Sequence, residues 1–311
     1  MSNSTALPSK IGHIIYPSDV PSKSKSTLAK PLNVVKYNTT GQYFLSAGND
    51  KKINLFNAYS GAHIKTYEAH GYEITDLAVS FDNAKLVSCG GDKQVFYWDV
   101  AEGVTIRRFS GHSQRVNTVA FNADASIVVS GSFDATVRLW DTKSNSQVPI
   151  QVLDQAKDSV TALATHRHQI ITGSGDGRIR TYDLRKGLMT VDVIGHPVVS
   201  LQPANDGQTV LVSTLDSKVR LFDNANGGLL QEFSGHRCRD YRIPAVFSDT
   251  EAFIMSGSED GRVVMWNVVS GKKVHDLSAH DGKVVSGLAM HPKGGQVISC
   301  GGDGNIVLWT T

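Results

Sequence analysis

Short runs of apolar and β-branched residues, interrupted by Gly, Ser and Asp, follow one another along most of the chain. The segment Val128–Asp141 (VVSGSFDATVRLWD) shows the pattern, because two apolar runs flank a polar turn at Gly131–Asp134. Such runs around a turn of small polar residues are typical of a β-hairpin. No segment has apolar residues at a convincing helical spacing. The pattern therefore predicts short strands and tight turns.

The hairpin is repeated seven times at a nearly constant interval. Its turn Asp recurs at separations of 42, 42, 42, 40, 44 and 43 residues. An aromatic residue ends the second strand of each hairpin; it is Trp in four of the seven, and Asp or Asn follows it in six. In five repeats a His precedes the turn Asp by 20 to 24 residues. The seven turn residues are Asp50, Asp92, Asp134, Asp176, Asp216, Asp260 and Asp303.

A period of about 40–45 residues, with Gly-His early and Trp-Asp late, resembles the blade of the WD-repeat family. Seven such units in order imply an all-β fold, a seven-bladed WD-repeat β-propeller with four antiparallel strands per blade. In the third repeat we predict the four strands at Val116–Phe121, Ile127–Ser130, Val137–Asp141 and Val148–Leu153.

The segments outside the repeats predict how the ring closes. We expect a disordered tail at residues 1–10, a strand at residues 11–16, a Ser/Lys/Pro linker at 17–31 and the propeller repeats at 32–311. The seventh repeat ends after its third strand, and a bare sheet edge there would expose unpaired backbone groups. The strand Ile11–Tyr16 is therefore predicted to complete the last blade and close the ring.

Composition and charge narrow the classes of partner. No apolar run approaches the length of a transmembrane helix, and no apolar secretory segment is visible near the N-terminus, so no membrane association is expected. Residues 1–30 carry four Lys and one Asp, whereas residues 31–311 have a net charge of −1. A nearly neutral body cannot neutralise many phosphates, so RNA contact is expected to be weak or indirect at most.

The three Cys residues form no CxxC pair, which indicates buried residues in a reducing compartment.

The recurring His, Ser, Asp and Trp residues are the ones in this sequence that could suggest a catalytic site. A catalytic triad repeated four times in one chain would be odd, so we interpret these residues as buried structural tetrads in which Asp, His, Ser and Trp are hydrogen-bonded in series, as the WD-repeat resemblance implies. No catalytic residue, metal site or cofactor is predicted. The four sets are His70, Ser88, Asp92 and Trp98; His112, Ser130, Asp134 and Trp140; His236, Ser256, Asp260 and Trp266; and His280, Ser299, Asp303 and Trp309.

The remaining candidate site is a surface. In a propeller the turn between the second and third strands lies on the same face as the loop that enters the first strand, and we call this the top face. Polar and aromatic residues beside the tetrads are predicted to bind a partner there, because Arg and aromatic residues are enriched at interface hot spots. They are Tyr72, Arg115, Phe133, Leu215, Arg239, Tyr241 and Glu259.

Several segments resemble the mitogen-activated protein kinase organizer family (WD-repeat-containing protein 83), in order and with similar spacing. The resemblance implies a non-enzymatic scaffold that is associated with the spliceosome in pre-mRNA splicing and with mitogen-activated protein kinase cascades. It implies protein partners, a propeller that is monomeric within a larger complex, and a location in nucleus and cytoplasm. The segments are His70–Asn83, Gly90–Lys93, Val116–Asn122, Gly175–Arg185, Leu215–Asp223 and Ser258–Gly271.

Two other classes of function stay open. Trp140–Lys143 (WDTK) and Tyr182–Arg185 (YDLR) resemble the short box of substrate receptors in cullin-type ubiquitin ligases. An enzyme is the other alternative, although no set of residues favours one chemistry.

Overall fold

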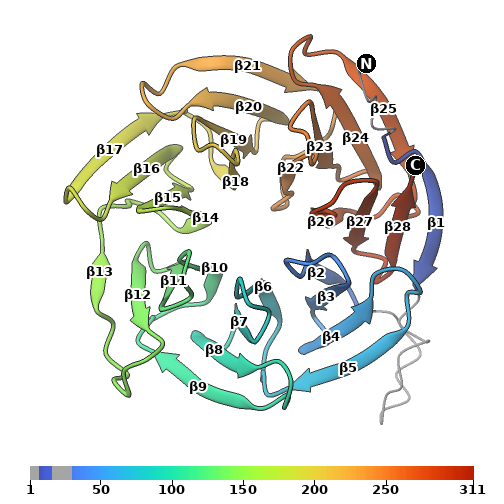
Figure 1. Cartoon of the computed structure of the whole chain (residues 1–311). Coiled ribbons are helices and arrows are strands. Elements are labelled where there is room, and N and C mark those ends of the chain that lie inside the picture. Colours follow the sequence, from blue (N-terminus) through green and yellow to red (C-terminus); the bar gives the residue numbers. More distant parts are fainter. Residues whose placement is uncertain (1–6, 16–29) are drawn as a thin grey trace.

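In the computed structural model, which describes residues 7–15 and 30–311, seven four-stranded antiparallel sheets surround a central axis. Figure 1 shows the ring along this axis, with one sheet per blade. The prediction of a seven-bladed, all-β propeller is confirmed, and the described residues contain no helix. Each of the first six blades uses four strands that are consecutive in the chain, whereas the seventh combines the two ends of the chain.

The strands are short, and most contain five or six residues. Blades one to three contain β2 (Leu32–Tyr37), β3 (Tyr43–Gly48), β4 (Lys52–Asn57) and β5 (His63–Glu68); β6 (Ile74–Val79), β7 (Lys85–Gly90), β8 (Gln94–Asp99) and β9 (Thr105–Ser110); and β10 (Val116–Phe121), β11 (Ile127–Ser132), β12 (Val137–Asp141) and β13 (Gln151–Leu153). Blades four and five contain β14 (Val160–His166), β15 (Gln169–Ser174), β16 (Arg178–Asp183) and β17 (Leu188–Val193); and β18 (Val198–Pro203), β19 (Thr209–Thr214), β20 (Lys218–Asp223) and β21 (Leu229–Ser234). Blades six and seven contain β22 (Ala245–Phe247), β23 (Phe253–Gly257), β24 (Arg262–Asn267) and β25 (Lys273–Ser278); and β26 (Val285–Met290), β27 (Gln296–Gly301), β28 (Ile306–Thr310) and β1 (Lys10–Ile15).

The third blade shows where the strand prediction was right and where it was wrong. Its first and third strands have the predicted bounds, and its second strand extends two residues further, to Ser132. The fourth strand begins at Gln151, three residues later than predicted. The predicted start included Pro149, which has no N–H to donate to a neighbouring strand.

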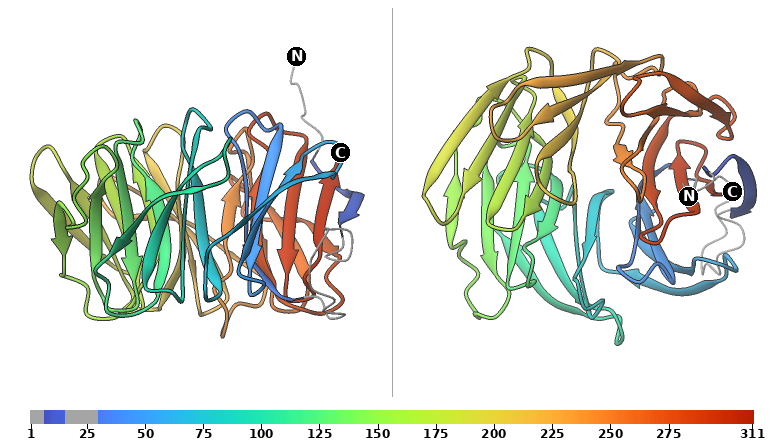
Figure 2. Two further views of the ribbon diagram at one scale, coloured as in Figure 1. Left: turned by 90° about the horizontal axis from the view of Figure 1, so that it is seen from below. Right: turned by 45° about the horizontal axis from the view of Figure 1, so that its top comes forward.

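The closing strand is present, and its position corrects one boundary. β1 pairs antiparallel with β28, with Ile15 opposite Ile306 and Ile11 opposite Trp309. Figure 1 shows β1 at the outer rim beside β28, and Figure 2 shows the dark blue β1 next to the red strands of that blade. Lys10 was expected in the tail but belongs to the strand, because the backbone pairing continues to the last residues of β28. Tyr16, the tail residues 1–6 and residues 17–29 of the predicted linker lie outside the described residues.

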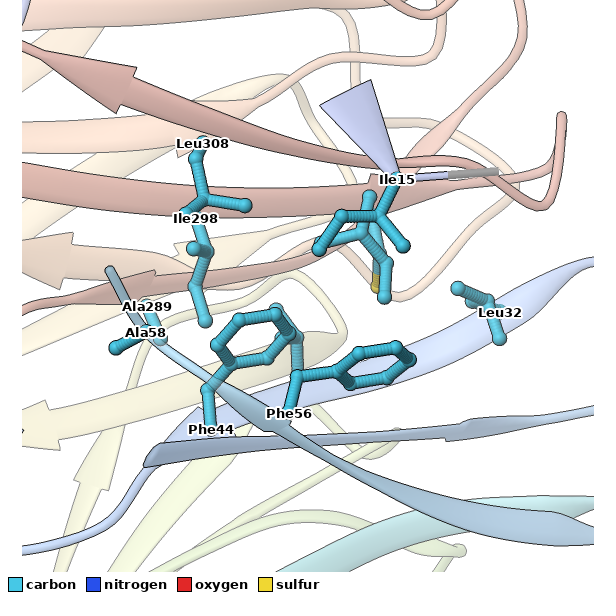
Figure 3. Packing of buried hydrophobic residues seen from close by; sticks show 11 residues of the cluster. Ile15, Leu32, Phe44, Phe56, Ala58, Ala289, Ile298 and Leu308 are labelled. Atoms are coloured by element: carbon cyan, nitrogen blue, oxygen red, sulfur yellow. The ribbon is translucent and has the colours of Figure 1, made fainter. Parts of the chain in front are cut away.

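Apolar side chains join the first and last blades into one core. Ile15 is only 4% exposed and packs in a cluster with residues of β2, β3, β4, β27 and β28. Figure 3 shows Ile15 above the Phe44 and Phe56 rings, and these two rings stack with centroids 5.1 Å apart. The N-terminal strand therefore contributes an apolar contact to the junction between blades as well as backbone hydrogen bonds.

The innermost strands of the blades surround a central channel of about 970 Å³, which is lined by both polar and apolar residues. Pro244 directly precedes the innermost strand of the sixth blade, β22, which begins at Ala245. Within the described ranges no helix is long and apolar enough to cross a membrane. In the same part of the chain no three His, Cys, Asp or Glu residues are grouped so that they could hold a metal ion.

Candidate functional site

Three of the four predicted tetrads are present with all their hydrogen bonds. In the third blade His112 contacts Asp134 through Nδ1 at 3.0 Å and Ser130 through Nε2 at 2.9 Å. The Trp140 indole N–H donates to the same Ser130 Oγ at 2.9 Å. The second and seventh blades repeat this arrangement with His70, Ser88, Asp92 and Trp98, and with His280, Ser299, Asp303 and Trp309.

Each of the three tetrads connects the turn Asp of its blade, on the top face, to side chains that are buried in the same blade. The His and Ser side chains lie inside the sheet, and the Asp carboxylate lies in the turn, where it also accepts a backbone N–H from the loop that enters the blade, such as that of Ser113 in the third blade. Burial alone would raise the pKa of Asp134, but hydrogen bonds that include those from Thr136 and Ser113 hold it well below its usual value. Burial lowers the pKa of His112, so the imidazole is neutral at physiological pH. The geometry supports a structural network, because the Ser hydroxyl is engaged by both the His and the Trp.

The fourth predicted tetrad, in the sixth blade, is wrong. Trp266 donates to the backbone oxygen of Ser234 rather than to Ser256. Both ring nitrogens of His236 lack a hydrogen-bond partner among the described residues. Arg262 takes the carboxylate instead, donating to Asp260 Oδ2 from Nε at 2.9 Å and from Nη2 at 2.5 Å. A two-donor contact from a permanent cation is stronger than one from a neutral imidazole, so the turn uses Arg262 in place of His236.

In the fourth and fifth blades an Arg side chain also binds the turn Asp, and this contact was not predicted from the sequence. Arg180 donates to Asp176 at 2.6 Å and to Ser174 at 2.8 Å, although its guanidinium is buried. Arg220 contacts Asp216 at 2.5 Å and Thr214 at 2.7 Å in the same way. Both Arg residues lie four positions after the turn Asp in blades that have no complete tetrad, and this spacing was the available signal.

The third blade has a complete tetrad and the sixth does not, so one Ser→Ala substitution in each blade tests how much the tetrad stabilises the fold. Ser130 and Ser256 occupy the same blade position, and both are fully buried. Ser130→Ala removes the partner of both His112 and Trp140, so we expect the free energy of unfolding to fall by about 1–3 kcal/mol. Ser256 Oγ contacts only backbone carbonyl groups, so Ser256→Ala should cost less than about 1 kcal/mol. Urea denaturation of both variants measures the difference, and equal losses would contradict the role of the tetrad.

The unpartnered His236 predicts a pH dependence of stability. Burial lowers its pKa to about 4, and the charges of Asp216 and Asp260 offset this only partly. Between about pH 6.5 and pH 4 the unfolded chain therefore binds a proton that the native state does not, and the free energy of unfolding falls as the pH falls. His236→Phe should remove about 2 kcal/mol of the fall between pH 7.5 and pH 5. Urea denaturation at pH 7.5 and pH 5 measures it, and parallel pH profiles for wild type and variant would exclude His236 as the cause.

The predicted top-face residues divide into two groups. Tyr72, Arg115 and Phe133 lie together at the second and third blades, where they line a pocket of about 500 Å³ with Lys93. Tyr72 is 60% exposed and Phe133 is 44% exposed. The Arg115 guanidinium lies 5.1 Å from the centre of the Phe133 ring. These residues form an accessible surface of the kind predicted.

The second group belongs to the loop of the sixth blade, and part of it is structural. Tyr241 is 55% exposed, and Arg239 is exposed beside it. Glu259 was predicted to bind a partner, but its side chain is only 6% exposed. Its carboxylate accepts backbone N–H groups of the loop, including that of Arg239 at 2.6 Å. Leu215 was also expected at the surface, but it packs against a small core of Val199, Cys238 and Ile243. Glu259 is therefore engaged by its own loop, and Leu215 is only partly exposed.

The same loop sends one side chain across the central channel, which the sequence analysis did not predict. Arg242 donates to the backbone oxygen of Asn117 in the third blade at 2.6 Å and to that of Val199 in the fifth blade at 3.2 Å. Its guanidinium also lies 3.6 Å from the Asp76 carboxylate in the second blade. The longer interval between His236 and Asp260 was a signal for an unusual loop, but it did not show where the loop points.

Comparisons with known proteins agree with the fold and the repeat pattern. A family model described as nucleolar protein 10-like, N-terminal domain, matches residues 34–243, and one described as WD domain, G-beta repeat, matches residues 227–267 and 271–310. The chain is 47% identical to the WD repeat domain-containing protein 83 of Homo sapiens over 296 residues, which cover 94% of this chain and 93% of the relative. The Danio rerio protein of the same name is 49% identical over 279 residues, 89% of this chain and 88% of the relative.

A third relative, an uncharacterized WD repeat-containing protein of Schizosaccharomyces pombe, is 44% identical over 270 residues, 87% of this chain and 91% of the relative. The WD-repeat propeller is typically a non-catalytic scaffold for protein interactions. The chain belongs to the WD-repeat family, together with the proteins named WD repeat domain-containing protein 83.

Proposed function

We propose that this chain is a scaffold that holds protein partners on its top face and serves in pre-mRNA splicing as a spliceosome-associated factor. The main support for a binding surface on the top face is a single pocket in which two exposed aromatic side chains, Tyr72 and Phe133, lie beside Arg115. Exposed aromatic and Arg side chains around a concave surface are the usual anchors of protein interfaces. The splicing role rests on the resemblance to the organizer family.

We also propose where this scaffold acts in the cell and which other partners it binds. The scaffold is monomeric within a larger complex, acts in nucleus and cytoplasm, and also binds components of mitogen-activated protein kinase cascades. RNA contact is indirect or weak, because the repeats have almost no net charge.

Affinity purification from cells, followed by mass spectrometry, tests both parts. The variant Arg115→Ala/Phe133→Ala/Tyr241→Ala should fold normally and lose splicing proteins by about 10-fold or more. The matched control changes exposed residues in loops of the opposite face, as Tyr59→Ala/Phe81→Ala/Arg167→Ala, and should keep its partners. Full recovery of partners by the top-face variant would overturn the binding surface, and the absence of splicing proteins from the wild-type sample would overturn the splicing role.

A role as substrate receptor of a cullin-type ubiquitin ligase is the second candidate. Lys143 and Arg185, the last residues of the two box-like segments, are both exposed and follow the third strands of neighbouring blades. Arg185→Ala should then abolish co-purification of the ligase's propeller adaptor. Absence of that adaptor from the wild-type sample would exclude this candidate.

A further inference from the structure

Five side chains on the top face of the first three blades form what we call the basic-aromatic cluster: Lys51, Tyr72, Lys93, Arg115 and Phe133. Both aromatic rings are accompanied by a cation, since Lys51 Nζ lies 5.8 Å from the centre of the Tyr72 ring and Arg115 lies over Phe133. The pocket between the rings is lined by these aromatic residues together with Lys93, Arg115 and one acidic residue, Glu73.

The three cations of the cluster are electrostatically unsatisfied. Over residues 7–15 and 30–311 none of Lys51, Lys93 and Arg115 has a carboxylate within ion-pair distance. The cations of the sixth blade differ, because Arg237 pairs with Glu259 and Arg262 with Asp260. The cluster therefore places three exposed cations, none of them in an ion pair, beside a pocket whose lining includes one acidic residue, Glu73.

The two lysines occupy a backbone position where glycine is less strained. The residue after the turn Asp has a positive φ in every blade, and three blades use Gly there. Lys51 has a φ of 68° and Lys93 a φ of 61°, in the left-handed region that costs a residue with a Cβ more than it costs glycine. Ala135 and Ser217 show that the turn tolerates other residues. The lysines are therefore unnecessary for the turn, and their charge is the property that a ligand can use.

We propose that the basic-aromatic cluster binds an acidic, extended peptide segment of a partner protein. An apolar side chain of the peptide enters the pocket between Tyr72 and Phe133, and flanking carboxylates pair with Lys93, Arg115 and Lys51. The proposal rests on the proposed function of the top face and adds the chemistry of the partner. A single-stranded RNA fits the cluster less well, because Lys51 and Arg115 already lie over the ring faces on which bases would stack.

The test begins with selection of 12-residue peptides from a random phage-displayed library on the immobilised full chain. Selected peptides should be rich in Asp and Glu around one large apolar residue. Fluorescence anisotropy of these peptides then measures binding to Lys51→Gly/Lys93→Gly, which removes two charges while installing the residue that other blades use. We expect at least about 10-fold weaker binding, and the same loss for Phe133→Ala. Binding should also weaken as salt rises from about 0.05 to 0.5 M.

A control variant separates the loss of the lysine charges from the change in the turn backbone. Ala135→Gly makes the same backbone change one blade further on without removing a charge, and should leave binding unchanged. Recovery of no peptide, enrichment of neutral or basic peptides, or equal binding by wild type and the lysine variant would overturn the proposal. Tighter binding of a 12-nucleotide oligouridine than of the peptides, lost in the lysine variant, would assign the cluster to RNA instead.

The two proposals can fail separately. If partners from cells are lost in the Arg115/Phe133/Tyr241 variant but the selected peptides are not acidic, the top face remains the binding surface and only the peptide chemistry is wrong. If the partners are fully retained while acidic peptides bind through the lysines, the cluster is a peptide site and the proposed scaffold surface is wrong.

Discussion

Deletion of residues 1–15 is expected to lower the unfolding temperature and the soluble yield more than any single substitution in the chain. The deletion leaves the outer edge of β28 without its partner β1 and removes Ile15 from the core between the first and last blades. A bare edge next to an opened apolar core exposes both backbone groups and apolar surface, which favours aggregation. Thermal unfolding and size-exclusion chromatography of the deletion variant measure both effects.

Three controls separate the strand from the segment that precedes it. Deletion of residues 1–6 should leave the unfolding temperature unchanged. Ile15→Ala should cost about 2–4 kcal/mol, because the side chain is 4% exposed. Ile11→Ala should cost less than about 0.5 kcal/mol, because Ile11 is 46% exposed. If the deletion of residues 1–15 unfolds at the wild-type temperature, closure by β1 has no energetic importance.

Closure by β1 also has a kinetic consequence. Its pairing with β28 joins residues at opposite ends of the chain. The entropy of closing so long a loop is lost before the hydrogen bonds are gained, so this contact should form late in folding.

Repetition made the fold predictable from the sequence. Seven turns in register fixed the number of blades, and the missing fourth strand of the last blade pointed to the N-terminal segment. The errors arose where one repeat departed from the others. The sixth blade contains all four tetrad residue types, yet Arg262 binds Asp260 in place of His236. Residue types at the right spacing did not reveal this competitor, because the outcome depends on which donor reaches the carboxylate with better geometry.

The top face was predictable only in part, for a related reason. The sequence located the turns, so Tyr72 and Phe133 were correctly expected at the surface. The same reasoning placed Glu259 there, but its carboxylate folds back onto the backbone of its own loop. Arg242 was missed because its partners, the backbone oxygens of Asn117 and Val199, lie in other blades. Contacts across the channel leave no local pattern in the sequence.

Trp140→Ala is expected to be the most destabilising single substitution in a tetrad, costing about 3–5 kcal/mol of unfolding free energy. The side chain is 1% exposed, and its ring stacks on Phe109 with centroids 5.4 Å apart, so truncation leaves a large cavity. The substitution also removes a hydrogen bond to Ser130, which His112 still contacts. Urea denaturation at pH 7.5 measures the loss.

Trp140→Phe separates packing from hydrogen bonding. It keeps most of the ring and loses only the indole N–H and part of the volume, so we expect a cost of about 1–2 kcal/mol. Trp266 is the matched control, because it is equally buried but donates to the backbone of Ser234 outside any tetrad. Trp266→Ala should therefore cost nearly as much as Trp140→Ala, since packing dominates both. If Trp140→Phe is as harmful as Trp140→Ala, then the hydrogen bond to Ser130 dominates, and the packing argument for the tetrad Trp is wrong.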